Sequence, residues 1–155
     1  MVTLRAVGVE DADLVATLVR AAFAAQSVPT DPPASALRLS ADDVRAHLAG
    51  GGGGAVVAEA DRLVGSALWS EQDGGLYVAR VAVDAAWRRR GVARRLLGAA
   101  EAAARVLGLP RLHLGTRLVL LDNRTLFAAC GFVEVSRHAH PGYDAPTWVA
   151  MEKRL

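Results

Sequence analysis

Apolar and polar residues alternate in some stretches of this chain, and apolar residues recur every three or four positions in others. Alternation predicts half-buried strands, and the wider spacing predicts amphipathic helices. Strands are predicted at residues 2–7, 55–60, 63–69, 76–83, 111–115, 132–136 and 148–153. Helices are predicted from a cap at Asp11 or Asp13, after Ser40, from near Arg90, and from Asn123 to Cys130. The predicted order is therefore β-α-α-β-β-β-α-β-α-β-β.

The longest predicted helix lies between the strands at 76–83 and 111–115. It ends at Gly108 and Pro110, a glycine and a following proline of the kind that terminates helices. A helical crossover of this type joins parallel neighbours in a sheet. The sequence therefore predicts a mixed sheet of α/β or α+β type, and not a doubly wound nucleotide fold.

Five consecutive glycines, Gly50 to Gly54, follow the second predicted helix and precede a strand. A phosphate-binding loop would follow a strand, open a helix and normally bring a lysine with it. The run is therefore interpreted as a flexible connector.

Length and composition narrow the class of protein. The chain has 155 residues, about one domain, and 52% of them are apolar, which favours a globular protein. Its 18 Lys and Arg against 16 Asp and Glu give a net charge of only +2, which predicts neither nucleic acid nor a membrane as a partner. The single cysteine, Cys130, cannot form an intramolecular disulfide, and no apolar run reaches the length of a signal peptide or membrane span. These features predict a cytoplasmic protein.

The run from Val81 to Leu97 carries the strongest chemical signal. Its strand residues 81–83 lead into a basic turn, 88–93, which opens a helix. The first N–H groups of a helix have no intrahelical partner, so this arrangement predicts an anion site. Five arginines lie between Arg88 and Arg95. Alone, they are also consistent with a solvated helix face or a nucleic-acid patch.

Arg88, Gly91 and Ala93 fill the pattern Gln/Arg-x-x-Gly-x-Gly/Ala, and the chain thereby resembles the GNAT superfamily of N-acetyltransferases, whose acyl-CoA pyrophosphate loop has this pattern. Residues 126–132, LFAACGF, are similar to the family's late motif Leu-Tyr-x-x-x-Gly-Phe, and the tail from His140 to Lys153 is similar to the family's closing strands. The resemblance covers essentially the whole chain. It implies one domain over 1–155, a mixed sheet of about seven strands with a splayed parallel pair, and about four helices.

The resemblance also implies acetyl-CoA as co-substrate and no metal. Backbone groups of Val81 and Val83 would pair with the pantetheine amides, and the N–H of Ala82 would stabilise the oxyanion. Amides of about 89–94 would hold the pyrophosphate, with Gly91 required because a side chain would block its approach. The expected cofactor-binding residues are Val81, Ala82, Val83, Arg88, Arg89, Arg90, Gly91, Val92, Ala93, Arg94, Asn123 and Phe127. Guanidiniums of the first three arginines would meet the 3′-phosphate, and Asn123 would contact pantetheine or cap its helix.

Two departures from the family pattern affect the catalytic roles. Phe127 occupies the position of the usual tyrosine and cannot donate a proton to the departing thiolate. The loss is tolerable, because a thiol with a pKa of about 8.5 makes a thiolate at pH 7 only about 2 kcal/mol uphill. Water, Tyr143 or Cys130 could supply that proton.

The strand at 76–83 also lacks the carboxylate that many members use as general base. Glu71, Asp73, His138, His140 and a water chain are the candidates, and His140 could equally cap a loop. The predicted catalytic residues are Ala82, His140 and Tyr143. Six aromatic and histidine side chains could line the acceptor side: Trp69, Tyr77, His138, His140, Tyr143 and Trp148.

The sequence thus predicts an N-acetyltransferase that moves an acetyl group from acetyl-CoA to a primary amine of a small molecule or peptide. The amine would attack directly in a ternary complex. A catalytically silent acyl-CoA-binding module is the alternative, motivated by Phe127 and the missing carboxylate. A nucleic-acid-binding domain ranks third, because no aromatic residues interleave the arginines. A homodimer is possible because sheet edges of such folds often pair.

Overall fold

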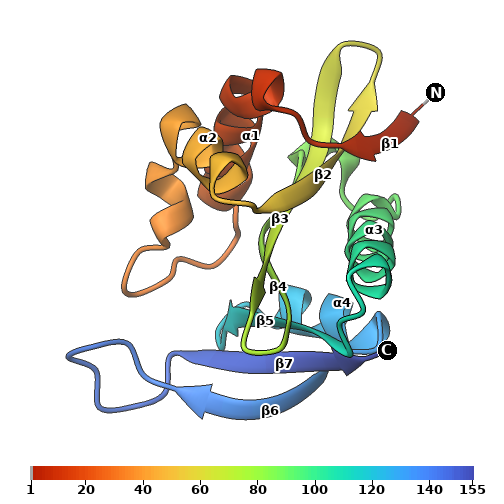
Figure 1. Ribbon diagram of the computed structural model, residues 1–155. Helices are drawn as coiled ribbons and strands as arrows, with labels where there is room; N and C mark the ends of the chain where they lie inside the picture. Colours follow the sequence, from red (N-terminus) through yellow and green to blue (C-terminus); the bar gives the residue numbers. More distant parts are fainter. Residues whose placement is uncertain (1) are drawn as a thin grey trace.

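The computed structural model describes residues 2–155, which contain one seven-stranded sheet in the order β1-β2-β3-β4-β5-β7-β6 (Figure 1). The strands are β1 Val2–Ala6, β2 Gly53–Glu59, β3 Arg62–Gln72, β4 Gly75–Val83, β5 Arg111–Arg117, β6 Val133–His138 and β7 Trp148–Arg154. All neighbouring strands are antiparallel except β4 and β5, which are parallel. The predicted mixed sheet with one parallel pair is therefore confirmed.

Four α-helices accompany the sheet within the described range: α1 Ala12–Ala24, α2 Ala41–Ala49, α3 Val92–Val106 and α4 Leu121–Ala129. Short 3-10 helices occur at η1 Val9–Asp11, η2 Ser35–Arg38 and η3 Ala85–Trp87. The order of strands and α-helices is the predicted one. None of the helices in residues 2–155 has the length and apolar character needed to cross a membrane.

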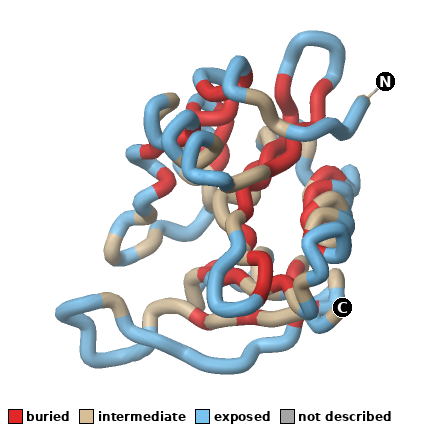
Figure 2. Tube along the Cα trace, in the orientation of Figure 1, coloured by how far each residue is buried: buried red, intermediate tan, exposed pale blue. Residues whose placement is uncertain are grey.

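Each face of the sheet has its own apolar core. On one face Val57, Val64 and Leu76 pack with α3, whose Leu96 is fully buried. On the other face Val56 packs with Val15 of α1 and its neighbours. Adjacent strand residues such as 56 and 57 serve opposite cores because side chains alternate across a strand. Figure 2 shows buried positions along the central strands and on the inner sides of α1 and α3.

The parallel pair separates soon after it begins. β4 pairs with β5 only at Leu76↔Leu112 and Tyr77↔His113, although both strands continue beyond these residues. On its other edge β4 contains a bulge, because Leu68 lies opposite Ala79 whereas Ser66 lies opposite Ala82. Residues 80 and 81 therefore oppose Ala67 alone, and Arg80 has a φ of 55°. The predicted splayed pair is confirmed.

The glycine run is a connector only in part: Gly50 to Gly52 link α2 to β2, as predicted, whereas the last two glycines belong to a strand. Gly53 and Gly54 form the start of β2, and their backbone pairs with Trp69 and Leu68 of β3. A Cβ on Gly54 would lie 2.4 Å from the Ala67 carbonyl oxygen, and one on Gly53 would lie 2.8 Å from the Trp69 indole nitrogen. Close approach, and not flexibility, explains these two glycines.

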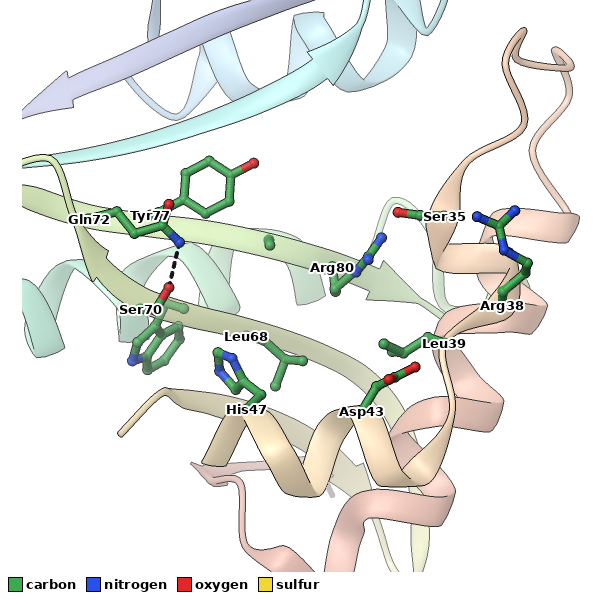
Figure 3. A pocket seen from close by; sticks show the side chains of 12 residues that line it. Ser35, Arg38, Leu39, Asp43, His47, Leu68, Ser70, Gln72, Tyr77 and Arg80 are labelled. Atoms are coloured by element: carbon green, nitrogen blue, oxygen red, sulfur yellow. Dashed lines mark hydrogen bonds between the residues drawn. The ribbon is translucent and has the colours of Figure 1, made fainter. Parts of the chain in front are cut away.

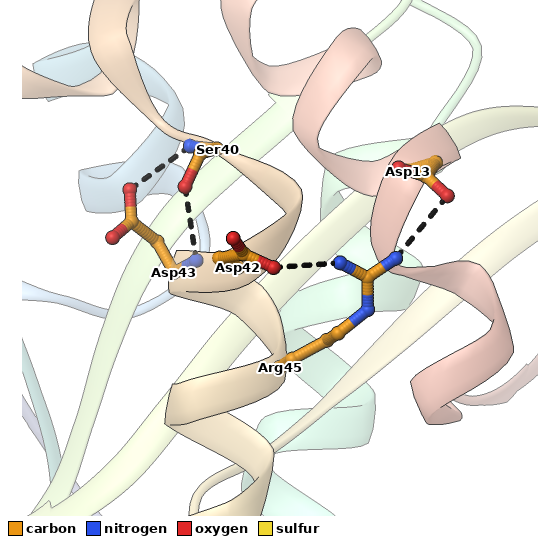
Figure 4. A network of polar contacts seen from close by, with 5 residues as sticks. All are labelled: Asp13, Ser40, Asp42, Asp43 and Arg45. Atoms are coloured by element: carbon orange, nitrogen blue, oxygen red, sulfur yellow. Dashed lines mark hydrogen bonds and ion pairs between the residues drawn. The ribbon is translucent and has the colours of Figure 1, made fainter.

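The predicted helix caps have mixed outcomes. Ser40 caps α2 as predicted: its hydroxyl accepts from the Asp43 amide at 3.0 Å, and the Asp43 carboxylate accepts from the Ser40 amide at 2.9 Å (Figure 4). Asp11 precedes α1 but does not cap it, because its carboxylate accepts from Arg5 and the Gly8 amide, and the Arg5 hydrogen bond lowers its pKa. Asn123 is no cap either, because α4 already begins at Leu121.

Two glycine substitutions test the explanation for the glycine run. Gly54→Ala should lower the free energy of unfolding by about 1–3 kcal/mol, because the backbone oxygen of Ala67 cannot move aside. Gly98→Ala in α3 is the control: its Cβ would meet nothing within 4 Å, and the change should raise stability by about 0.5–1 kcal/mol. Urea denaturation measures both values. Equal stability of the two variants would contradict the close-approach explanation.

Candidate functional site

A cavity of about 700 Å³ lies beside the gap between β4 and β5, and its walls come from β4, the start of α3, α4 and the end of α1. It gathers most of the residues that the sequence predicted as a binding site. The predicted residues that line it are Val81, Ala82, Val83, Arg88, Arg89, Gly91, Val92, Ala93, Arg94, Asn123 and Phe127. Arg90 does not line it: its guanidinium lies 4.8 Å from the ring centre of Trp87.

The start of α3 supplies free backbone donors to this cavity. The first amide bonded within the helix is that of Arg95, which donates to the Gly91 carbonyl at 3.1 Å. Among residues 2–155, the amides of Val92, Ala93 and Arg94 have no acceptor. With the positive end of the helix dipole, these three N–H groups give the start of α3 the geometry that favours binding of an anion.

Gly91 shapes the turn before these donors. It precedes the helix with a φ of 80°, a left-handed conformation that disfavours side chains. A Cβ there would meet nothing within 4 Å, so the protein itself requires glycine for its backbone conformation and not for space. The predicted clash with a phosphate stays a prediction.

The hydrogen-bonding direction of β4 decides which of its backbone groups face the gap. The Asp84 amide donates to the Val64 carbonyl at 2.8 Å. Since opposite residues of an antiparallel pair alternate between bonded and non-bonded, the Ala82 amide also faces β3, at Ser66. The amides and carbonyls of Val81 and Val83 then face the unpaired side. This geometry favours Val81 or Val83 over the predicted Ala82 as a backbone donor to a ligand.

The α4 wall of the cavity is largely apolar. Phe127 is buried, and its ring lies edge-on to Phe132 at a centroid distance of 5.9 Å. It offers no proton donor. Asn123, in the first turn of α4, also lines the cavity, whereas Cys130 lies half-buried at the end of the helix.

The two predicted catalytic side chains on the β6–β7 loop lie elsewhere. His140 contacts Thr147 through both its ring and its backbone amide, and Tyr143 donates its hydroxyl to Asp31 at 2.5 Å. Burial, and then the Arg117 charge, lower the pKa of His140, whereas the bond to Asp31 raises the pKa of Tyr143. Neither side chain lines the cavity, and the contacts of His140 match the loop-capping alternative. Their catalytic roles stay predictions.

The other candidate bases also lie away from the cavity. Glu71 and Asp73 are exposed at the β3–β4 hairpin, and His138 stacks on Trp148 at 4.4 Å. Over residues 2–155 there is no group of three or more His, Cys, Asp and Glu side chains that could hold a metal ion.

A second cavity, of about 500 Å³, lies on the opposite face of β3 and β4, between these strands and the helices α2 and η2 (Figure 3). Trp69 and Tyr77, two of the six residues predicted for the acceptor side, line it. The charged and histidine residues of this cavity were not predicted from the sequence: they are Arg38, Asp43, His47 and Arg80. One signal was available, because Arg80 interrupts an otherwise uncharged strand, LYVARVAV.

Comparison with known proteins identifies one matching family. The family model described as "Acetyltransferase (GNAT) family" matches residues 17–132. No curated protein matches the sequence significantly.

Solved structures share the fold. PaiA N-acetyltransferase from Thermoplasma acidophilum, in complex with coenzyme A, has a TM-score of 0.79 at 14% identity, over 100% of this chain and 99% of that one. The ribosomal-protein-S18-alanine N-acetyltransferase from Escherichia coli has a TM-score of 0.77 at 17% identity, over 99% of this chain and 94% of that one. An acetyltransferase of GNAT family from Staphylococcus aureus Mu50 has a TM-score of 0.76 at 13% identity, over 99% of each chain.

The anion site at α3 can be tested with pyrophosphate alone. At ten times its Kd, pyrophosphate should stabilise the protein by about 1.4 kcal/mol, which thermal unfolding detects as a raised Tm. Gly91→Glu should abolish this shift, because it places a negative charge beside the free amides. Gly98→Glu adds the same charge two turns further along the same helix and should keep the shift. An equal response of both variants would show that pyrophosphate binds elsewhere.

Proposed function

This chain belongs to the acetyltransferase (GNAT) family, and we propose that it transfers an acetyl group from acetyl-CoA to a primary amine. The acceptor amine belongs to a small molecule or peptide and attacks the thioester directly. One observation carries the proposal: the free amides of α3 and the unpaired edge of β4 open into the same cavity.

Each part of acetyl-CoA has a matching set of groups in or beside this cavity. The amides of residues 92–94 bind the pyrophosphate, and the unpaired backbone groups of Val81 and Val83 bind the pantetheine amides. Arg88 and Arg89 bind the ribose 3′-phosphate through their guanidiniums. The coenzyme A complex of the Thermoplasma relative supports this choice of co-substrate.

In the proposed reaction, protons are exchanged with solvent and not with a protein side chain. The acceptor ammonium first loses a proton to solvent, because only the neutral amine has a free electron pair. The amine nitrogen then forms a bond to the thioester carbon, and the amide of Val81 or Val83 stabilises the resulting oxyanion. The added nitrogen loses a second proton to solvent, the C=O bond re-forms as the C–S bond breaks, and the thiolate leaves and takes a proton from water. Fixing both reactants in one geometry provides the main acceleration.

A catalytically silent acyl-CoA-binding module is the second candidate, and buried Phe127 is the observation that favours it. Thiol release from acetyl-CoA, measured across a broad panel of primary amines, separates the two. Amine-dependent release supports the transferase. Saturable acetyl-CoA binding with no release above the hydrolysis rate supports the silent module.

The arginine assignment predicts a selective loss of phosphate recognition. The double variant Arg88→Gln/Arg89→Gln should weaken acetyl-CoA binding about tenfold, or about 1.4 kcal/mol, and leave binding of its 3′-dephospho form unchanged. Arg90→Gln is the matched control, since Arg90 stacks on Trp87 outside the cavity. Calorimetric titration of the wild-type protein and both variants with the two ligands measures all six affinities. A loss confined to Arg90→Gln would reassign the phosphate site.

If protons are exchanged with solvent, substitutions in the β6–β7 loop should have small effects on kcat. His140→Ala and Tyr143→Phe should each change kcat by less than about threefold, because neither side chain lines either of the two cavities described above. A general base or acid would contribute about 10²–10⁴-fold. A loss of that size in steady-state kinetics, with unchanged thermal stability, would make the residue catalytic after all.

A further inference from the structure

The second cavity meets the proposed acetyl-CoA site at the β4 bulge. Arg80 lines the second cavity, whereas the next three residues, 81–83, line the first. A molecule in the second cavity therefore contacts β4 beside the backbone groups that hold the thioester under the proposed function, on which this inference rests. An acceptor placed there approaches from the face opposite α3.

The bulge is what turns Arg80 into this cavity. In a regular strand, residue 80 would share the face of Leu76 and Val78, which pack in the core below α3. The extra residue at 80 and 81 shifts the alternation, so Arg80 joins Tyr77 and Ala79 on the α2 side (Figure 3). Its φ of 55° is strained for a residue with a side chain, and glycine would form the same bulge with less strain.

Two guanidiniums in this cavity form no ion pair with the described residues, 2–155. Arg80 is half-buried, Arg38 of η2 projects from the opposite wall, and neither makes a hydrogen bond or ion pair with any side chain or carbonyl of residues 2–155. The other arginines of this region are paired; Arg45, for example, contacts Asp13 and Asp42 (Figure 4).

The remaining charged and polar groups leave the cavity with a positive excess. Asp43 is its one carboxylate, and that group already accepts from the Ser40 amide at 2.9 Å. This hydrogen bond, with a smaller contribution from the Arg80 charge, lowers the pKa of Asp43, so it is ionised at neutral pH. Two guanidiniums against one carboxylate favour an anionic ligand.

The histidine of the cavity has a structural hydrogen bond. His47 Nε2 lies 2.9 Å from the Gly53 carbonyl, which can only accept, so Nε2 carries the proton and donates it. The ring thereby fixes the turn between α2 and β2. Anion binding in the cavity is left to the two arginines.

We propose that the amine acceptor also carries a carboxylate, which Arg38 and Arg80 bind while the amine reaches the thioester at the bulge. A planar guanidinium matches a carboxylate with paired hydrogen bonds. Trp69 and Tyr77 form an aromatic wall beside the carboxylate. The acceptor class is thus an amino acid or a related amine–carboxylate, and not a polyamine.

Acetyl transfer to matched compounds tests this acceptor class. The probes are the twenty L-amino acids, their α-carboxamides and the corresponding amines without the carboxyl group, with CoA thiol release as the readout. The best amino acid should exceed its amide in kcat/KM by roughly tenfold or more, as expected for a charge-assisted hydrogen-bonded pair. Amides or simple amines that react equally well would overturn the inference.

Variants connect the preference to the two arginines. Arg80→Gln and Arg38→Gln should each lower kcat/KM for the amino acid by roughly tenfold and leave the amide unchanged. Arg38 is exposed on η2, so its variant remains informative if Arg80→Gln folds poorly. Arg45→Gln removes an arginine of α2 that does not line the cavity and should change neither substrate. Loss of the amide reaction in parallel would overturn carboxylate recognition.

A binding measurement separates failure of this inference from failure of the proposed function. Calorimetry titrates the same amino acids into the wild-type protein and Arg38→Gln, and acetyl-CoA into both. Acetyl-CoA binding without any arginine-dependent amino acid binding or turnover overturns the acceptor class alone. Amino acid binding that needs Arg38, with no acetyl-CoA binding, supports the carboxylate site and removes the transferase.

Discussion

The separation of β4 from β5 is the constraint on which the rest of this structure depends. Two parallel strands that pair at only two positions leave a row of N–H and C=O groups without sheet partners. Such groups need water or a ligand to bond with. The helix α3 crosses between the two strands and packs its apolar face on β2, β3, β4 and β5. The same crossover brings the start of α3, with its three free amides, to the open edge of β4.

The bulge at Arg80 places the Arg80 side chain in one cavity and residues 81–83 in the other. Beyond it, Val81 and Val83 point their side chains into the α3 core and their backbone groups into the gap. At the bulge itself, a guanidinium enters the cavity below α2. One irregularity thus exposes backbone groups on one side of the sheet and a charge on the other. This arrangement explains how two reactants could meet at one strand without sharing a binding surface.

The sequence predicted the order of the elements correctly because each has a strong local signal. Alternation marks β4, and helical spacing with Gly108 and Pro110 marks α3. That residues 81–94 line one cavity with free amides was predictable too, since they form a contiguous segment. What failed depends on contacts between distant residues. Gly54 begins a strand because it lies against the Ala67 carbonyl, and that contact leaves no trace in a glycine run. The second cavity combines η2, α2, β3 and β4, and only the lone charge of Arg80 hinted at it.

Backbone hydrogen exchange with and without coenzyme A tests the central claim most directly. The claim is that the unpaired groups of β4 and α3 bind the ligand. The account predicts that exchange slows at the amides of Val81, Val83 and residues 92–94 when coenzyme A binds, while the Ala82 amide, already bonded to β3, changes little. Slowing confined to amides around Trp69 and His47, with residues 81–94 unaffected, would contradict it.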